Sequence, residues 1–393
     1  MDYRQQIAQL EENLARELEG ISHYLYLHPE LGLEERLAAG FLTEYLEEKG
    51  FAVERNWHGM ETAFAARWGT EGPCVAFLAE YDALPGHGPQ GCDNGHSCGH
   101  NWIAATTVGA AVVVKELCQA AGIPARILLA GCPAEETFGA KSLLAREGAF
   151  DGVDCALQAH LSEETNLYHR SLALTAMELR YFGRSAHAAA APWEGINALD
   201  AIQLFYAGVA ALRQQLRPDV RLHGIIREGG KAANSIPERA SCLYYARAEK
   251  RADLDKVVER LLDVAKGAAL MTGARLEVTW PEQPMDDTRH FPSLDRLMEK
   301  VLAREGYTSI SKAESDRRTV GSTDVGNVSQ VCPTAFVEIG VDGFNCHTEE
   351  ALALADCGCY DSLHRTVRLL ADAAMEVLCD PALREQLWKE FYQ

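Results

Sequence analysis

The chain has 393 residues, 47% of them hydrophobic and 24% charged, which is typical of a globular protein with about two or three domains. Its 57 acidic residues outweigh 37 lysines and arginines, and the net charge of −20 argues against nucleic acid or an anionic membrane as a partner. We find neither a signal peptide nor a membrane span of about 20 apolar residues. With twelve scattered cysteines read as reduced thiols, we expect a cytoplasmic protein.

The first part of the chain alternates between helical and strand patterns. The polar start, residues 1–20, looks helical, and apolar spacing from Leu37 to Leu46 predicts a second helix that ends near Gly50. Residues 101–121, rich in alanine, threonine and valine, predict a helix buried against a sheet. Strands are predicted at 62–68, 74–79, 126–131 and 154–160. This alternation favours an α/β fold whose sheet is mainly parallel and covered by helices.

The middle of the chain has a different order of elements. The predictions are a strand at 172–182, a helix at 197–216, strands at 222–228 and 239–249, a helix at 254–271 and a strand at 275–280. The order β-α-β-β-α-β is that of the ferredoxin-like split unit, so we predict an inserted domain at 172–283. Residues 1–171 and 284–393 then form one surrounding domain, with a strand at 334–339 and a long helix after Glu349.

The segment Cys98-Gly99-His100 lies where the helix at 101–121 is predicted to begin. Thiolate and imidazole are good ligands for zinc and similar metals, and a helix start favours the thiolate over the thiol. By itself, however, such a pair is more often a buried thiol beside a hydrogen-bonded histidine. Further ligands are needed before a metal site is predicted.

The acidic pair Glu135-Glu136 directly follows the apolar strand at 126–131. Ligands of open α/β sheets gather at the carboxyl ends of the strands. Two adjacent carboxylates at such a place can divide the work, because one binds a metal while the other holds the attacking water and moves its proton. A solvated acidic pair is the commoner meaning of two glutamates, but the apolar strand before this pair and Phe138-Gly139 after it disfavour plain exposure.

Other candidate ligands also fall at strand ends. His160 ends one predicted strand, and His347 lies just past another. Asp82 follows the strand at 74–79 and is a candidate for a carboxylate that orients a ligand. A single histidine at a strand end is usually structural. The argument for a metal site is that all these residues converge on one edge of the sheet.

The inserted domain carries three polar candidates. His187 follows a predicted strand, Asn234 lies in a loop, and Arg247 sits on the next strand. Histidine and asparagine can donate hydrogen bonds to an oxyanion, and arginine can clamp a carboxylate. A polar turn and an exposed strand arginine explain the same spacing equally well.

Taken together, the motifs resemble those of the aminoacylase-like co-catalytic metallopeptidases. Within them, the sequence is similar to the branch of aminobenzoyl-glutamate hydrolases and indole-acetyl-amino-acid hydrolases. The matching segments, in family order, are HPELGLEE (28–35), EYDALP (80–85), CGHN (98–101), PAEE (133–136), GRSAHAAAAPWEGINALDA (183–201), the Asn234 loop and GSTDVGNVS (321–329). They span nearly the whole chain, so the set is far more specific than any one segment.

The resemblance implies a two-metal catalytic domain, formed by 1–171 and 284–393, with an inserted lid at 172–283 that also makes a homodimer. The implied metal ligands are Cys98, His100, Glu136, His160 and His347. Glu135 would be the general base and Asp82 would support the site. His187 would reach the partner subunit's active site and stabilise the oxyanion, while Asn234 and Arg247 would bind the substrate's carboxylate end.

Two positions depart from the family pattern. Glu80 stands where the wider family has a metal-binding histidine, and this branch usually relies on the Cys98-Gly99-His100 segment instead. Asn101 stands where many relatives of the branch have aspartate, which removes a charge near the site.

The expected function is a metal-dependent hydrolase that cleaves the amide bond of an N-acyl, N-aminoacyl or aminobenzoyl amino acid or a dipeptide by a metal-bound hydroxide. It would hold two divalent ions per subunit, with zinc or manganese favoured over cobalt or nickel. Two alternatives stay open at this point. One is a hydrolytic deaminase acting on a small carboxylated aromatic amine, and the other is a non-catalytic protein that binds carboxylated small molecules.

Overall fold

The computed structural model describes residues 3–86, 88, 93–318 and 320–393. The chain forms two compact units. The first unit comprises Met1–Arg170, Thr288–Val320 and Asp324–Gln393, and the second comprises Ser171–Asp287 and Gly321–Thr323. The predicted inserted domain, 172–283, lies within the second unit.

The first unit is built on a six-stranded sheet in the order β1-β2-β6-β3-β7-β12. The strands are β1 (Ala52–Arg55), β2 (Phe64–Trp68), β3 (Cys74–Ala79), β6 (Arg126–Gly131), β7 (Cys155–Ser162) and β12 (Thr334–Gly340). The four strands β6, β3, β7 and β12 are parallel, whereas β1 and β2 are antiparallel at one edge. The expected α/β fold with a mainly parallel sheet is confirmed, although β1 was not among the predicted strands. A short β-ladder joins β4 (Leu84–Pro85) to β5 (Asn94–Gly95).

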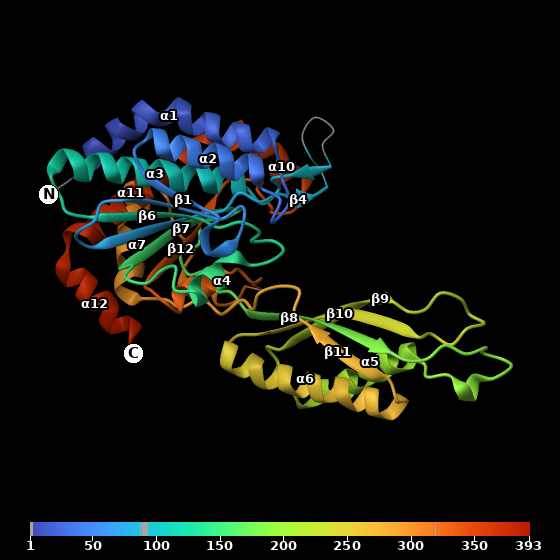
Figure 1. The fold of residues 1–393 in the computed structure, drawn as a ribbon. Helices are drawn as coiled ribbons and strands as arrows, with labels where there is room; N and C mark the ends of the chain where they lie inside the picture. The colour runs from blue at the N-terminus through green and yellow to red at the C-terminus, as the bar shows by residue number, and fades with distance from the viewer. Residues whose placement is uncertain (1–2, 87, 89–92, 319) are drawn as a thin grey trace. The chain divides into compact units, whose positions relative to one another are not determined.

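Helices cover both faces of this sheet (Figure 1). One hydrophobic core packs α1 (Arg4–Leu27), α2 (Arg36–Glu48), α3 (His100–Ala121), α7 (Pro292–Arg304) and α11 (Tyr360–Cys379) against the sheet. A second core on the other face includes α4 (Ala140–Arg146) and α9 (Val325–Ser329). The remaining helices of this unit are α8 (Lys312–Ser315), α10 (Glu349–Leu354) and α12 (Pro381–Phe391).

Helix α3 bears on the expectation that no segment is long and apolar enough to span a membrane. It is long and apolar enough, by length and composition, to pass a test for a membrane span. Within the protein, however, 83% of its apolar window is buried, and it packs against the sheet strands and against α1 and α11. Its hydrophobicity on all sides is therefore that of a central core helix, as the predicted buried helix required.

The long helix predicted after Glu349 is present as α11, but it begins only at Tyr360, because the structure breaks the chain after a short helix. Helix α10 ends at Leu354, a 3-10 turn follows at Cys357–Cys359, and α11 then begins. The break lies at Asp356, whose backbone has φ −93° and ψ −126°, outside the helical region. The Asp356 carboxylate accepts hydrogen bonds from the ring of His23, at 3.0 Å, and from the Tyr360 hydroxyl, at 2.9 Å. Contacts distant in sequence therefore stabilise the break.

The second unit has the predicted order β-α-β-β-α-β. Its elements are β8 (Ala173–Phe182), α5 (Ala198–Leu212), β9 (Arg221–Glu228), β10 (Arg239–Ala248), α6 (Arg251–Thr272) and β11 (Arg275–Thr279). The strands pair antiparallel in the order β11-β8-β10-β9, and α5 and α6 cover one face of the sheet. The connections at 183–197 and 229–238 extend past the end of this sheet (Figure 1).

Candidate metal centre

The first unit brings the five predicted metal ligands together. Glu136 follows β6, His347 follows β12, His160 lies near the carboxyl end of β7, and Cys98 and His100 lie at the start of α3; such positions meet at one edge of a parallel sheet. Their donor atoms form three overlapping groups, each with all atoms within 4.8 Å of one another. The groups are Cys98, His100 and His160; Cys98, Glu136 and His347; and His100, Glu135 and Glu136. The predicted general base, Glu135, thus lies among the ligands.

Asp82 forms hydrogen bonds with two of these residues. One oxygen, Oδ1, lies 2.8 Å from Nδ1 of His100, and the other accepts the backbone N–H of Glu136 at 3.0 Å. Burial lowers the pKa of His100, but the negative charges of Asp82 and Glu80 outweigh burial and raise it well above its usual value. Among the described residues, Nε2 of His100 has no hydrogen-bond partner. A buried imidazole with one nitrogen anchored to a carboxylate and the other unpaired is the arrangement of a metal-ligating histidine.

Gly99 lets the chain turn between the two ligands at the start of α3. Its φ of +76° lies in the left-handed region, and a Cβ there would be 2.7 Å from Cδ1 of Leu161. The turn brings Sγ of Cys98 to 3.5 Å from Nε2 of His160. The other nitrogen of His160, Nδ1, lies 2.6 Å from the carbonyl oxygen of Leu161, to which it donates. Nε2 then keeps its lone pair for a ligand role.

Two ligand segments contain strained backbone. Ala134, just before the acidic pair, has φ +55°, and His347 has φ +67°. Residues other than glycine rarely adopt such angles, and they persist where the surroundings hold them. The backbone N–H of Ala134 donates to the buried carboxylate of Glu35 at 2.7 Å, and that of His347 donates to the carbonyl of Ser97 at 2.9 Å. Contacts with distant segments therefore hold the backbone that carries the acidic pair and His347.

Glu135 and Glu136 differ in their electrostatic surroundings. Burial raises the pKa of Glu136, but the hydrogen bond from His347, at 3.1 Å, and the charge of His100 outweigh it and lower the pKa to about 2. Burial and the nearby carboxylates of Glu80 and Glu136 raise the pKa of Glu135 well above its usual value. Adjacent carboxyls whose pKa values are pushed apart suit different roles, one as a ligand and one as a proton carrier.

Three further residues near this centre were missed as site residues. Glu35 accepts from Ala134 and from the Thr62 hydroxyl, and Asp324 and Lys141 form a buried ion pair at 2.5 Å. Glu35 and Asp324 lie in the segments HPELGLEE and GSTDVGNVS, which match the family. The match marked these segments but assigned no function to either residue. Lys141 provided no signal, because a lysine in a short helix is ordinarily exposed.

Asn101 has a structural role rather than an electrostatic one at the metals. Its side-chain amide nitrogen donates to the carbonyl of Ala355, at 2.7 Å, and to the hydroxyl of Ser22, at 3.0 Å. The carbonyl of Ala355 can only accept, so an aspartate here would leave it without this donor. The asparagine that replaces the aspartate of many relatives therefore ties α3 to α1 and to the break after α10.

In the second unit, the structure brings His187 and Asn234 side by side. Their segments run antiparallel, with the N–H of Ala188 donating to the carbonyl of Asn234 at 3.0 Å. Both side chains belong to exposed residues. Nδ1 of His187 accepts the N–H groups of Ala189 and Ala190, each at 3.2 Å. In the neutral ring, Nε2 then carries the proton and can donate it to a ligand.

Arg247 is not close to Asn234 within the same chain. It lies near the far end of β10, where it donates to the hydroxyl of Ser322 at 2.8 Å. The loop that holds Asn234 precedes β10, and the strand alone from Arg239 to Arg247 spans about 27 Å. The prediction that both residues bind the carboxylate end of one substrate therefore cannot hold for two residues of the same subunit.

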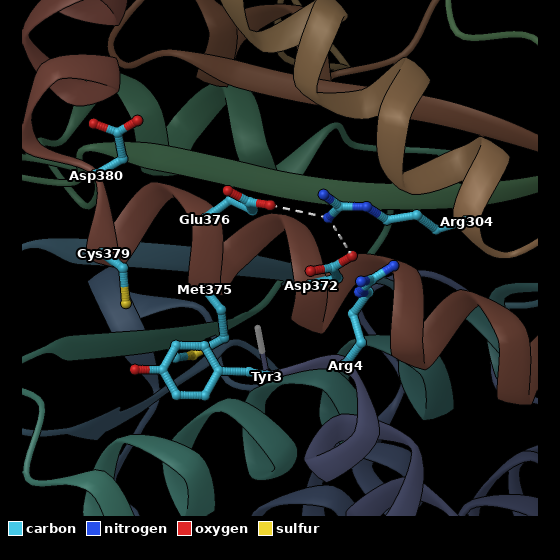
Figure 2. A pocket seen from close by; sticks show the side chains of 8 residues that line it. All are labelled: Tyr3, Arg4, Arg304, Asp372, Met375, Glu376, Cys379 and Asp380. Carbon is cyan, nitrogen blue, oxygen red and sulfur yellow. Dashed lines mark hydrogen bonds and ion pairs between the residues drawn. The ribbon is translucent and has the colours of Figure 1, made fainter. Parts of the chain in front are cut away.

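A separate cavity of about 540 Å³ lies in the first unit (Figure 2). It is lined by Tyr3, Arg4, Arg304, Asp372, Met375, Glu376, Cys379 and Asp380, none of which is a predicted site residue. Arg304 reaches between Asp372, at 2.7 Å, and Glu376, at 2.9 Å. Two acids of the same chain therefore neutralise the charge of this arginine.

Comparison with known proteins identifies the family. The model of "Peptidase family M20/M25/M40" matches residues 76–376. The chain belongs to this family. It is 36% identical over 396 residues to the Xaa-Arg dipeptidase of Mus musculus, covering 97% of this chain and 90% of the relative. It is also 36% identical over 269 residues to a p-aminobenzoyl-glutamate hydrolase protein of Escherichia coli, covering 65% of this chain and 56% of the relative.

Solved structures of M20 proteins share the fold. The aminobenzoyl-glutamate utilization protein of Klebsiella pneumoniae superposes with a TM-score of 0.75 at 21% identity, covering 94% of this chain and 98% of that one. A Bacillus subtilis protein described as a dinuclear metal binding peptidase of the M20 family gives 0.65 at 20% identity, covering 93% and 99%. The family assignment makes the chain a metallopeptidase-type hydrolase that acts on carbon–nitrogen bonds.

The residues of this chain fit the dinuclear metal site of its family. The unpaired Nε2 of buried His100, the thiol of Cys98 and the carboxylate of Glu136 offer three kinds of donor within one cluster. Such a mixed set binds divalent transition metals well.

Proposed function

We propose that this M20 protein hydrolyses the amide bond of an N-acyl amino acid or dipeptide that has a free α-carboxylate. The observation that carries the proposal is the convergence of the five donor residues in overlapping groups, one of which contains Glu135. The relatives named for dipeptide and aminobenzoyl-glutamate hydrolysis support amide cleavage beside a carboxylate rather than removal of an aromatic amino group.

Two divalent ions would be held by Cys98, His100, Glu136, His160 and His347. When bound, such ions polarise the amide carbonyl and lower the pKa of a water molecule between them. We propose zinc or manganese as the native metal. The thiolate favours zinc, and the carboxylate and imidazole ligands suit either metal. Metal analysis of protein purified without chelators, followed by reconstitution of metal-free protein, tests this choice.

Glu135 would move the proton that hydrolysis requires. Its carboxylate would take a proton from the attacking water and then give it to the nitrogen of the leaving amine. Asp82 and Glu35 would act indirectly, because the former holds His100 and the N–H of Glu136 while the latter holds the N–H of Ala134. Both keep the acidic pair in place for this transfer.

We further propose that the substrate is bound by residues of two subunits. Arg247 would clamp the α-carboxylate, whereas His187 and Asn234 would come from the partner subunit and donate to the oxyanion and to the substrate. The separation of Arg247 from Asn234 within one chain supports this division. The exposed position of His187, with a donor Nε2, fits a role outside its own subunit.

The edge strand β9 supports a homodimer through the second unit. It is the last strand of its sheet, so one of its backbone edges has no neighbouring strand among the described residues. Its residues Ile225 and Ile226 are 61% and 48% exposed. An exposed, apolar edge strand invites pairing with another strand, and a second copy of β9 is the occupant we propose.

The dimer proposal is tested by one substitution and a matched control. Ile225→Asp should convert the protein to a monomer in light scattering during gel filtration, because a buried charge would disrupt the paired edge. Leu270→Asp on α6, where the residue is 85% exposed, should leave the dimer unchanged. A wild-type protein that is monomeric at micromolar concentration would contradict the proposal.

A site shared between subunits is tested by mixing two inactive variants. A His187→Ala subunit keeps Glu135, and a Glu135→Ala subunit keeps His187, so a hybrid dimer contains one complete site. Activity should return on mixing to about half of the wild-type value per hybrid dimer, because a symmetric dimer has two such sites. Hybrid dimers that form but stay inactive would show that His187 acts in its own subunit or not at all.

The reaction itself is tested with three substrate panels. Xaa-Arg dipeptides, N-acyl amino acids and aminobenzoyl-glutamate should be incubated with metal-loaded protein, and the products identified by mass spectrometry. We expect release of a free amino acid, with dipeptides turned over best, and loss of the reaction when the α-carboxylate is amidated. Release of ammonia without an amino acid would support the deaminase alternative instead.

We also propose a cytoplasmic location. The eleven cysteines that the structure describes form no disulfide, and free thiols in such number persist in reducing compartments. Recovery of the native protein from an extracellular fraction would contradict this.

A further inference from the structure

A buried lysine lies beside the metal centre. Lys141 begins the first turn of α4 and is fully buried. Its Nζ lies 2.6 Å from Oε1 of Glu80 and 2.5 Å from Oδ1 of Asp324. The backbone N–H of the same lysine donates to the other oxygen of Asp324 at 2.9 Å. Both ends of Lys141 are therefore fixed, and its ammonium cannot move away without breaking several contacts.

The lysine lies where a metal ion would otherwise fit. The carboxylates of Glu80, Glu135 and Asp324 have oxygens within 4.8 Å of one another, which is a spacing that can hold a cation. The ammonium of Lys141 already contacts two of the three. A divalent ion at the same place would meet a positive charge at contact distance in a buried setting, where repulsion is strong.

Glu80 lies between this lysine and the predicted ligands. Its Oε2 is 3.7 Å from Nε2 of His100, the nitrogen that faces the metal centre, while Oε1 is taken by Lys141. Without the lysine, Glu80 would be free to turn toward the metals. With it, one carboxylate oxygen is fixed on the side away from His100.

We propose that Lys141 is a positioning residue that substitutes for a third cation, holds Glu80 out of the metal-ligand set and fixes the carboxylates around Glu135. This inference rests on the proposed function for the identity of the ligands and the base. It adds that the metal content is limited to two ions by a side chain of the protein, and that Glu80 acts through Glu135 rather than on a metal.

The first test compares two glutamates by metal content. Glu80→Gln should keep two ions per subunit, measured by mass spectrometry of the metals after dialysis, while its kcat falls about 10–100-fold and its KM changes less than threefold. Glu136→Gln should lose at least one ion. A Glu80→Gln protein that holds one ion fewer than wild type would overturn the proposal. A Glu136→Gln protein that keeps both ions would instead overturn the proposed ligand set, so the two failures are distinguishable.

The second test removes the ammonium. Lys141→Met should bind a third divalent ion in excess metal, where native mass spectrometry of the wild type shows two, and its kcat should fall about 10–100-fold. The double variant Lys141→Met with Asp324→Asn removes one charge of each sign, so it should return to two ions and recover part of kcat. A folded Lys141→Met protein with two ions and wild-type kcat would contradict the proposal. If this variant does not fold, the metal content of Glu80→Gln still tests whether Glu80 is outside the metal-ligand set.

Discussion

The first unit holds two groups of charged side chains, one partly buried between helices and one at the metal centre, and they differ in how their charges are compensated. Between α1 and α11, His364 lies 2.7 Å from Glu11 and 3.0 Å from Glu19, and Arg368 contacts Glu11 at 2.9 Å and Glu305 at 2.8 Å. Each carboxylate there faces a basic side chain. The group is a network that ties α1 to α11 and reaches Glu305, directly after α7.

The metal centre is not balanced in this way. Its carboxylates are Glu80, Asp82, Glu135, Glu136 and Asp324. Lys141 contacts Glu80 and Asp324, His100 contacts Asp82, and His347 contacts Glu136. The fifth carboxylate, Glu135, pairs with no basic side chain among the described residues. A buried carboxylate is costly unless a cation or a proton compensates it. The balanced group needs nothing further, whereas the metal centre requires cations from outside. An excess of buried carboxylates over basic side chains, rather than the presence of ion pairs, therefore marks the functional site.

The largest effect is expected at the base. Glu135→Gln should lower kcat by roughly two to four orders of magnitude, because the proton of the attacking water loses its acceptor. The variant should keep both metal ions, since Glu135 is not proposed as a ligand. The exposed Glu163→Gln is the matched control and should be fully active. A Glu135→Gln protein with near-normal turnover would contradict the assignment of the base.

The next effect concerns the residue that orients the ligands. Asp82→Asn should weaken metal binding about 10–100-fold, because an amide cannot accept from both His100 and the N–H of Glu136. The affinity can be measured by competition with a chromogenic chelator. Excess metal should restore much of the activity, which would not happen if Asp82 acted directly in the chemistry.

The smallest effect is expected for the His364 group, and it is measured as the pH dependence of the free energy of unfolding. The two glutamates raise the pKa of His364 above its usual 6.5. The stabilisation that its positive charge provides is therefore complete below pH 6.5 and is lost as the pH rises through the raised pKa. His364→Gln should lower the free energy of unfolding by about 1.5–3 kcal/mol at pH 6, with no change in metal content. The difference from wild type should narrow as the pH is raised.

A matched control uses an exposed pair. His23 contacts Asp356 at 3.0 Å but its side chain is 51% exposed, so His23→Gln should cost less than about 1 kcal/mol at pH 6. Denaturant unfolding at several pH values measures both variants. An equal cost for the two histidines would show that burial adds nothing to the His364 network.

In the first unit, the sequence predicted the strands and the convergence of the ligands but not the role of Lys141. The strands β3 and β6 were placed at their observed limits, because buried parallel strands are short apolar runs bounded by polar turns. The convergence of the ligands followed from the rule that strand carboxyl ends meet at one edge. The role of Lys141 could not be predicted, since its burial depends on packing between α4 and the segment around Asp324.

Separation along a strand was the other limit. The family resemblance implied that Asn234 and Arg247 bind the same end of the substrate. An extended strand carries the chain about 3.4 Å per residue, so the structure places them at opposite ends of β10. Two such residues can serve one substrate only if they come from different subunits, as we propose, and no pattern within one chain reveals that arrangement.

The central claim is that the metal centre holds two divalent ions that the hydrolysis requires. The most direct measurement is to add zinc or manganese stepwise to metal-free protein while recording bound ions per subunit and the rate of dipeptide hydrolysis together. We expect negligible turnover without metal and a rate that stops rising at two bound ions. Full turnover in metal-free protein, or a plateau at one bound ion, would contradict it.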